Sequence, residues 1–290
     1  MEHTSEEKQS PFAVRPNERA IINHPKHKPK QGILTYNIEN GIFNEEHFMY
    51  LKRVNEYRFI TSKQLYEVLL YEGYSVKSQQ KVADKLEYMF NSGVLRRVNF
   101  ESDVGEGKFK AYAVGSFGTP LLKARSVRLT SSPADLALLP NKIKRVLATN
   151  QVFISVREGL DALCFYPLFK SDEVSHAIVK PSLSLKCNDK SYIVDVVRTF
   201  DGWEADFKWK FERYRKVYKS IDFKKHDLTS SPTLVLVGEN SDHVKGLEVI
   251  VNDVMSSKMS FLKELFGGDK HIDIKYYKDS DFRYVSDCFK

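Results

Sequence analysis

Amide and basic side chains gather between residues 77 and 110 in a pattern suited to binding a nucleic acid. Glutamine side chains both donate to and accept from base edges, and lysine and arginine side chains neutralise phosphates. We expect base contacts from Gln79, Gln80 and Lys81. Phosphate contacts are expected from a larger basic set, which consists of Lys77, Lys85, Arg96, Arg97, Lys108 and Lys110.

Two short helices are predicted to position these amides. Thr61, followed three residues later by Gln64, forms a capping-box pattern that predicts the start of a helix, and Gly73 is placed to end it. A second helix is predicted to start at Ser78. Its buried face is formed by apolar residues at helical spacing, namely Val82, Leu86, Met89 and Phe90. The amides and lysine at 79–81 therefore fall on the exposed face.

A basic ribbon is predicted to follow these helices. After Gly93 the apolar residues alternate with a period of two, and Gly105-Glu106-Gly107 predicts the turn between two strands. A further helix is expected at about 44–57. Helices followed by a β-ribbon are typical of a winged helix-turn-helix, so we predict that residues 35–125 bind double-stranded DNA through the major groove.

The alternative is a winged helix that binds protein instead of DNA. Asp84 and Glu87 lie on the same helix as the predicted base contacts and dilute its positive charge. The overall balance nevertheless favours an anionic partner, because the chain carries a net charge of +7 with an isoelectric point near 9.0.

Composition indicates a globular protein of two domains. The 290 residues are 42% hydrophobic, which is enough to bury a full core. The three cysteines, Cys164, Cys187 and Cys288, are widely spaced and predict neither a disulfide framework nor a zinc site. An apolar stretch of about 18 residues is missing, so we expect no membrane contact, no signal peptide and a cytoplasmic location.

Domain boundaries are predicted from polar and proline-containing segments. Residues 1–31 are expected to form a disordered basic tail, which could follow a DNA backbone, bind an acidic partner or remain solvated. Residues 126–140 are expected to form a linker. The overall fold class is therefore α+β with two domains, the second spanning residues 141–290.

The second domain is predicted to be an α/β sandwich. A helix is expected at 142–158, although 151–156 could equally be a strand, and Asn188-Asp189 predicts a hairpin between strands at 183–187 and 191–199. The remaining elements are a charged helix at 204–218, a strand at 233–237, a helix at 244–255 and a strand at 272–277.

Several short motifs together resemble the replication-relaxation family of Gram-positive plasmids and integrative elements. They are Gly93-Val-Leu-Arg-Arg97, residues 112–118, Ile193-Val-Asp-Val-Val-Arg198, and Lys210 with Tyr214, within a region from about Asn55 to Val237. The resemblance implies an accessory protein of plasmid replication, relaxation or conjugation, or a transcriptional regulator. It also implies a restriction-endonuclease-like second domain, a possible homodimer, and a relaxase or replication protein as a possible partner.

The resemblance makes Asp195 and Lys210 the candidate catalytic residues of that domain. Endonuclease-like folds place an acid after a proline and an acid-x-lysine pair on the next strand, but here Ser182 follows Pro181 and Val197 stands two residues after Asp195. One carboxylate cannot hold a divalent cation, so we expect no cofactor and no metal site, and an ion pair of Asp195 with Arg198 at the sheet edge.

Magnesium would be needed if the domain were a nuclease. Its ligands would then be drawn from a migrated set comprising Glu158, Asp161, Asp172 or Glu173 with Asp195, and Lys208 or Lys210 would replace the strand lysine.

The charged helix at 204–219 offers a second possible contact with nucleic acid. Its basic and aromatic residues are Lys208, Lys210, Arg213, Arg215, Lys216 and Lys219, interleaved with Trp203, Trp209 and Tyr214. The alternative is an amphipathic helix that covers a sheet with its aromatic side chains and leaves its lysines solvated.

Overall fold

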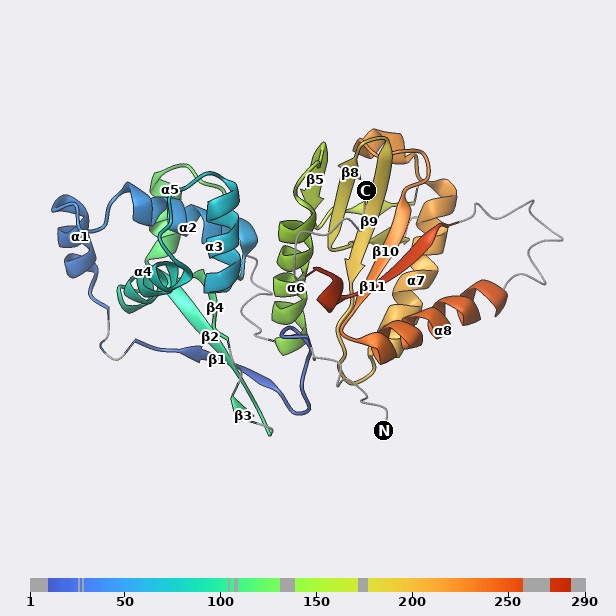
Figure 1. Ribbon diagram of the computed structural model, residues 1–290, viewed down its shortest axis with the longest axis horizontal. Helices are drawn as coiled ribbons and strands as arrows, with labels where there is room; N and C mark the ends of the chain where they lie inside the picture. Colours follow the sequence, from blue (N-terminus) through green and yellow to red (C-terminus); the bar gives the residue numbers. More distant parts are fainter. Residues whose placement is uncertain are drawn as a thin grey trace, which may run out of the picture. The chain divides into compact units, whose positions relative to one another are not determined.

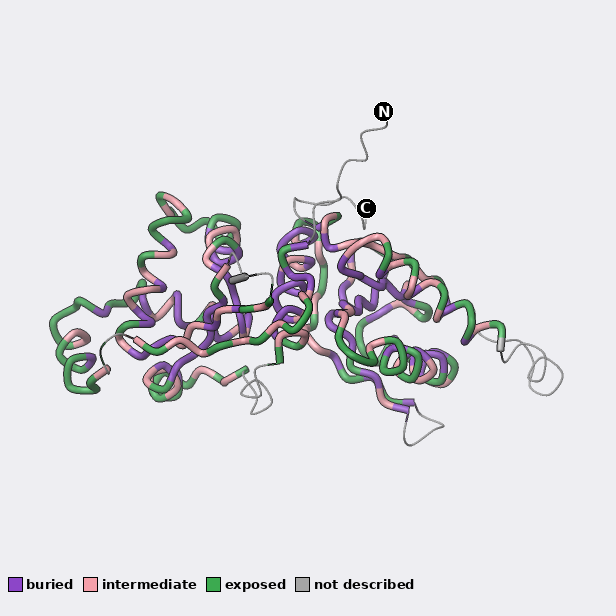
Figure 2. The backbone as a smooth tube through the Cα atoms, turned by 90° about the horizontal axis from the view of Figure 1, so that it is seen from below, coloured by how far each residue is buried: buried purple, intermediate pink, exposed green. Residues whose placement is uncertain are grey.

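The chain forms two compact α+β units in a computed structural model. The structure describes residues 10–25, 27, 29–103, 105–106, 109–130, 139–171, 177–257 and 272–282. One unit, here called the N-terminal unit, comprises Val14–Asn150, and the other, the C-terminal unit, comprises Met1–Ala13 with Gln151–Lys290. Each unit has its own sheet and its own helices (Figure 1), and the buried stretches lie inside each unit (Figure 2).

Within the described residues, five α-helices belong wholly to the N-terminal unit. They are α1 (Gln31–Glu39), α2 (Glu45–Tyr57), α3 (Ser62–Tyr71), α4 (Gln79–Asn91) and α5 (Gly118–Ala124). The predicted capping box of α3 is confirmed, because Gln64 N donates to Thr61 Oγ1 at 3.1 Å and Thr61 N donates to Gln64 Oε1 at 3.2 Å. The predicted start of α4 is also confirmed, since Ser78 Oγ accepts from Lys81 N at 3.3 Å.

The sheet of the N-terminal unit is built around one long strand. Its strands are β1 (Arg19–Asn23), β2 (Leu95–Ser102), β3 (Gly105–Glu106) and β4 (Ala111–Val114). β2 pairs antiparallel with β1, β3 and β4, and Ile60 forms an isolated bridge with Tyr112. Ser102 pairs with Gly105 and Glu101 with Glu106, so the first two residues of the predicted turn belong to β3.

The prediction of a disordered tail at 1–31 is wrong for its second half. Residues 19–23 form β1, in which Ile22 lies opposite Val98, and α1 begins at Gln31. The backbone groups along the outer edge of β2 would otherwise lack partners within the sheet, and β1 supplies them. Residues 1–9 lie outside the described residues.

A buried ion pair fixes the start of β1. Glu18 and Lys144 have 0% and 2% of their side chains exposed, and Lys144 Nζ lies 2.6 Å from Glu18 Oε2. Arg15 Nε donates to the other oxygen, Oε1, at 2.9 Å. Burial of a charge is costly unless an opposite charge compensates it, so Glu18 and Lys144 depend on each other.

The boundary between the units differs from the predicted linker at 126–140. Asn55 Nδ2 donates to Arg128 O at 2.9 Å, and Thr130 N donates to Asn55 Oδ1 at 3.2 Å, so residues 128 and 130 are held by the N-terminal unit. Residues 131–138 lie outside the described residues. The division falls after Asn150, inside the continuous helix α6 (Pro140–Val156). The possible strand at 151–156 is therefore helical.

The C-terminal unit contains a mixed sheet of five strands in the order β11-β10-β9-β8-β5. They are β5 (Ala162–Phe165), β8 (Leu183–Cys187), β9 (Lys190–Val196), β10 (Thr233–Gly238) and β11 (Ile274–Lys278). The predicted hairpin at Asn188-Asp189 is confirmed as the antiparallel pair β8 and β9, whereas β10 runs parallel to both β9 and β11. A separate two-stranded sheet pairs β6 (Phe169–Lys170) with β7 (Ile178–Val179).

Helices α7 (Trp203–Ser220) and α8 (Ser241–Ser257) connect the parallel strands. Both contribute to one core cluster with Ile193, Leu234 and Leu236, so both cover the same face of the sheet. Short 3-10 turns lie at Phe223–His226 and Asp279–Phe282. Within the described residues, none of the helices combines the length and the apolar character that crossing a membrane requires.

The ion pair of Glu18 with Lys144 should be essential for the stability of the N-terminal unit. Glu18→Gln removes the buried negative charge that Lys144 and Arg15 both contact, so the free energy of unfolding should fall by about 3–5 kcal/mol. The double variant Glu18→Gln/Lys144→Met removes the stranded charge and should recover part of this loss. Urea denaturation followed by circular dichroism measures both.

A matched control is the exposed pair of Lys63 and Glu67, whose Nζ and Oε1 atoms lie 3.7 Å apart. Lys63→Met should change the stability by no more than about 0.5 kcal/mol. If Glu18→Gln proves as mild as Lys63→Met, the buried pair does not hold β1 in place.

Candidate nucleic-acid interface

The first turn of α4 presents polar side chains to solvent. Lys77, Gln79, Gln80 and Lys81 are all exposed, while Val82 and Leu86 on the opposite face are fully buried. Within the described residues, neither Lys77 nor Lys81 has an ion-pair partner. Gln80 Nε2 donates to Asp84 Oδ1 at 2.8 Å, so this amide is already engaged on the helix surface. Gln79, Lys77 and Lys81 are therefore more accessible to an external ligand than Gln80 is.

Lys85, predicted to contact phosphate, has partners inside the protein. Its ammonium group pairs with Glu46 of α2 and lies 5.2 Å from the ring centroid of Tyr50. These contacts neutralise the charge and hold the side chain against α2. The structure therefore gives Lys85 a role in packing α4 on α2.

Arg97 is also paired within the unit. Its guanidinium group forms an ion pair with Glu87 of α4, and its Cζ lies 4.2 Å from the ring centroid of Phe90. Arg96 Cζ lies 5.6 Å from the ring centroid of Phe59. Lys110 is 48% exposed, with its Nζ 3.3 Å from Glu87 Oε1. Lys108 lies outside the described residues. Of the basic residues of the ribbon, Lys110 is the one that reaches solvent most clearly.

The Glu87 carboxylate joins the ribbon to α4. It accepts a hydrogen bond from Tyr112 Oη and pairs with both Arg97 and Lys110, so two strands meet at one side chain. Partial burial raises the pKa of Glu87, but the hydrogen bond from Tyr112 and the charges of Arg97 and Lys110 outweigh it, and the pKa lies below its ordinary value of 4.5. The pKa of Tyr112 is raised, first by burial and then by its bond to Glu87. Glu87 therefore stays ionised at neutral pH.

Two acids, Glu101 and Asp103, lie near the end of β2, while Lys108 of the predicted basic wing lies outside the described residues. Asn17 Nδ2 donates to Asp103 Oδ2 at 2.6 Å, which ties this turn to the segment before β1.

Sequence reasoning missed the central role of Glu87 and Tyr112. Glu87 was interpreted only as an acid that dilutes positive charge, and Tyr112 was not included in the site. Tyr112 pairs with Arg97 in the register of β2 and β4, which brings both side chains to α4. The alternation of residues along the ribbon does not by itself show that Arg97 and Tyr112 lie side by side. That follows only from the register of the two strands.

Asp195, the weak catalytic candidate, lies in the interior of the C-terminal unit. Its side chain is fully buried on β9, between β8 and β10, and Lys210 Nζ lies 2.5 Å from its Oδ2. Tyr214 Oη donates to the same oxygen at 3.1 Å. The structure thus brings Asp195 and Lys210 together, on a central strand and not at a sheet edge.

The predicted ion pair of Asp195 with Arg198 is wrong. Arg198 Nη2 instead donates to both carboxylate oxygens of Asp279, at 2.7 and 2.8 Å. Residues three apart in an extended chain point to opposite sides, which keeps Asp195 and Arg198 apart. Ser10 Oγ completes this second cluster with a hydrogen bond of 2.5 Å to Asp279 Oδ2.

A metal site at Asp195 finds little support in the geometry. Among the described residues no group of three His, Cys, Asp or Glu side chains could hold a metal ion. Asp172 and Glu173 lie outside these residues, and Lys208 pairs with Asp253 at 2.6 Å instead of approaching Asp195. The ammonium group of Lys210 occupies the position next to the carboxylate that a divalent cation would need.

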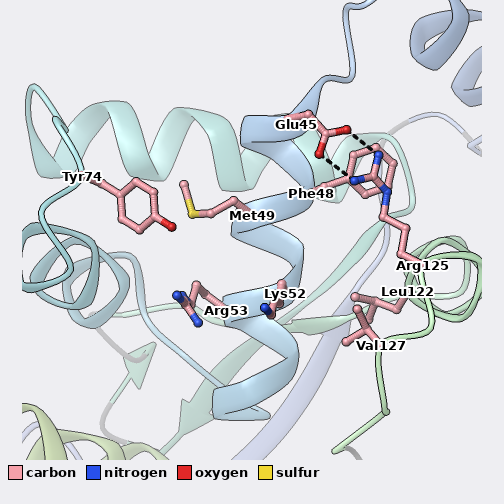
Figure 3. A pocket seen from close by; sticks show the side chains of 9 residues that line it. All are labelled: Glu45, Phe48, Met49, Lys52, Arg53, Tyr74, Leu122, Arg125 and Val127. Atoms are coloured by element: carbon pink, nitrogen blue, oxygen red, sulfur yellow. Dashed lines mark hydrogen bonds and ion pairs between the residues drawn. The ribbon is translucent and has the colours of Figure 1, made fainter.

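A cavity of about 270 Å³ lies elsewhere in the N-terminal unit, between α2, α5 and Tyr74 (Figure 3). Arg125 closes one side, since it bonds both Glu45 oxygens at 2.5 and 2.6 Å and its Cζ lies 3.5 Å from the ring centroid of Phe48. Arg53, also in the lining, bonds Glu72 at 2.8 Å. None of the predicted DNA contacts lines this cavity, so it is separate from the candidate interface.

Comparison of the chain with family models, with curated proteins and with solved structures gives no match. The functional argument therefore rests on the geometry of the two units and on the short motifs of the sequence.

Replacing Glu87 should uncouple the ribbon from α4. Glu87→Gln should lower the free energy of unfolding by about 1.5–3 kcal/mol near neutral pH, because it weakens charged hydrogen bonds. Folding lowers the pKa of Glu87, so the contribution is present above the unfolded value of 4.5 and is lost as the pH falls through the lower folded value. The difference in the free energy of unfolding between Glu87→Gln and the parent should therefore shrink in denaturation curves recorded at a pH below the folded pKa of Glu87.

Asp84→Asn is the matched control, because it makes the same change of charge on the same helix. Asp84 is exposed and bonds Gln80 only at the surface, so the effect should be small at every pH. An equal loss of stability in the two variants would contradict the role assigned to Glu87.

Proposed function

We propose that the N-terminal unit is a winged helix-turn-helix that binds double-stranded DNA, with α4 in the major groove. The observation that carries this proposal is the exposed start of α4, where Gln79 and Lys81 lie in the first turn and Lys77 directly precedes the N-cap Ser78. Residues near the start of a recognition helix are the ones that contact base edges in helix-turn-helix proteins. The order of α2, α3, α4, β2 and β4 is the one expected for a winged helix.

The geometry supports a smaller set of contacts than the sequence predicted. Gln79 is assigned to base edges, with Gln80 able to contribute once it leaves Asp84. Lys77, Lys81, Arg96 and Lys110 are assigned to phosphates. Lys85 and Arg97 become positioning residues, because Glu46 and Glu87 already neutralise them.

The C-terminal unit is proposed to be a restriction-endonuclease-like domain without catalytic activity. Its order of α6, β5, β8, β9, α7 and β10 supports this fold. In this proposal the unit serves as a platform for a homodimer, a relaxase or a replication protein. The assignment to a mobile element, in replication, relaxation, conjugation or transcriptional regulation, is supported by the short sequence motifs alone.

Removal of the charges at the start of α4 should weaken DNA binding at every sequence. Lys77→Gln and Lys81→Gln should each reduce the slope of log K against log salt by about 0.9, because each lysine then no longer displaces a counterion. Lys63→Gln is the matched control, since Lys63 is an exposed lysine of α3 that pairs with Glu67. Fluorescence anisotropy with a labelled duplex over a range of salt concentrations measures these slopes.

Gln79→Ala separates sequence recognition from charge. It should change the preference among duplexes selected from a random pool and leave the salt slope unchanged. The proposal is wrong if all three variants bind like the parent, or if Lys63→Gln weakens binding as much as the α4 variants do.

The contact of Asp195 with Lys210 favours one alternative, a metal-dependent nuclease. In that alternative Lys210 would supply the lysine that Val197 replaces on the strand. We expect the parent protein to leave supercoiled plasmid intact with magnesium or manganese, because Lys210 and Tyr214 already satisfy the carboxylate. Cleavage that disappears in Asp195→Asn, but persists in Asp253→Asn as the matched surface control, would establish the nuclease.

A further inference from the structure

The outer face of α7 carries a large aromatic side chain that the core does not use. Trp209 is 56% exposed, whereas Phe207, Phe211 and Tyr214 of the same helix are buried against the sheet. With 100° between successive residues, Trp209 lies nearly opposite the stripe formed by these three rings. Its indole therefore contributes little to the stability of the C-terminal unit.

One face of the indole is already covered by a cation. Arg213, one turn further along α7, has its Cζ 3.2 Å from the centroid of the Trp209 ring. Stacking of a guanidinium group on an aromatic ring holds both side chains in place. Trp209 remains 56% exposed although Arg213 lies over its ring, so a large part of the indole is accessible to another ring.

Positive charge continues along the same face of α7. Lys216 and Lys219 are exposed and follow Arg213 towards the end of the helix. Lys216 has no ion-pair partner within the described part of the chain. Glu212 is the acid nearest to this group in sequence, and the remaining acids, Glu204 and Asp206, lie in the first turn. Arg215 is excluded, because it is buried and donates to Val254 O at 3.0 Å.

We propose that this surface, formed by Trp209, Arg213, Lys216 and Lys219, binds single-stranded nucleic acid. A base stacks on the open face of Trp209, and the guanidinium and ammonium groups neutralise the phosphates that follow it along the helix. An aromatic ring beside a basic track is the combination that proteins use for single strands, because every base has a flat face to stack. In a duplex the bases are stacked on each other, so no base would be free to stack on the ring of Trp209.

The proposal concerns a different surface from α4 and does not depend on duplex binding. An acidic protein segment is the competing partner, because tryptophan and arginine are also enriched at protein interfaces. The surplus of cations along the helix attracts either partner. The exposed indole ring of Trp209, which Arg213 holds in place, favours the partner that carries bases.

Tryptophan fluorescence provides a direct test, since the chain contains only two tryptophans. Trp203 is partly buried, with its ring centroid 4.4 Å from that of His243, so Trp209 is the exposed reporter. Titration of the full chain with a thymine homopolymer should quench the emission. The quenching should persist in Trp203→Phe and disappear in Trp209→Phe, while anisotropy of a labelled strand shows that Trp209→Phe still binds.

Three further variants quantify the contacts. Trp209→Ala should weaken the binding of the strand roughly 5- to 150-fold, the range expected for loss of one base stacked on an aromatic ring. Lys216→Gln should reduce the salt slope by about 0.7, the value for one phosphate contact with a single strand. Lys245→Gln on α8 is the matched control, because it removes an exposed lysine of the same unit that faces Asp242.

Each outcome separates the proposal from its competitors. Equal affinity of Trp209→Ala and the parent would overturn it, as would tighter binding of polyglutamate than of the oligonucleotide. Loss of single-strand binding in Lys77→Gln/Lys81→Gln, with Trp209→Ala unaffected, would move the contact to α4 and also overturn it. Weaker duplex binding in the α4 variants with unchanged quenching of Trp209 would establish two independent surfaces.

Discussion

The geometry of the candidate interface depends on the Glu87 carboxylate. This side chain accepts from Tyr112 on β4 and pairs with Arg97 on β2, and it thereby fixes the angle between α4 and the ribbon. A helix and a ribbon must approach a duplex together, because a groove and its flanking phosphates have a fixed spacing. The acid that weakens the positive charge of α4 is thus the same acid that gives the surface a defined shape.

Internal pairing decides which basic residues are available to a partner. Arg97, Lys85 and Lys144 are all neutralised inside the N-terminal unit, although the sequence offers no local sign of it. A net charge of +7 therefore overstates the charge that a ligand would meet on any one surface. Among the described residues that were predicted to contact DNA, Lys77 and Lys81 have no ion-pair partner, and Lys110 is 48% exposed beside Glu87. In the proposed contact with DNA, recognition by shape and by amide contacts would then carry more of the specificity than electrostatic attraction.

Local sequence patterns predicted the elements whose signals are local. The capping box at Thr61 and the turn at Asn188-Asp189 each appear where the pattern places them, because their hydrogen bonds join residues close in sequence. β1 was missed because its partner, β2, lies more than seventy residues away. Asp195 and Lys210 were named as candidates, but the surroundings that saturate the carboxylate depend on how α7 packs. Long-range pairing, and with it the availability of a charged group, is the part that one sequence does not reveal.

The orientation of α7 links the interior of the C-terminal unit to its surface. Phe207, Phe211 and Tyr214 fix one side of the helix in the core, and Lys210 reaches Asp195 from the edge of that side. A rotation of α7 about its axis would break the buried ion pair and expose aromatic area, both of which are costly. Since the helix cannot rotate, Trp209 is held outwards with Arg213 stacked on it. The buried Asp195 carboxylate therefore helps to orient α7, and with it the proposed binding surface around Trp209.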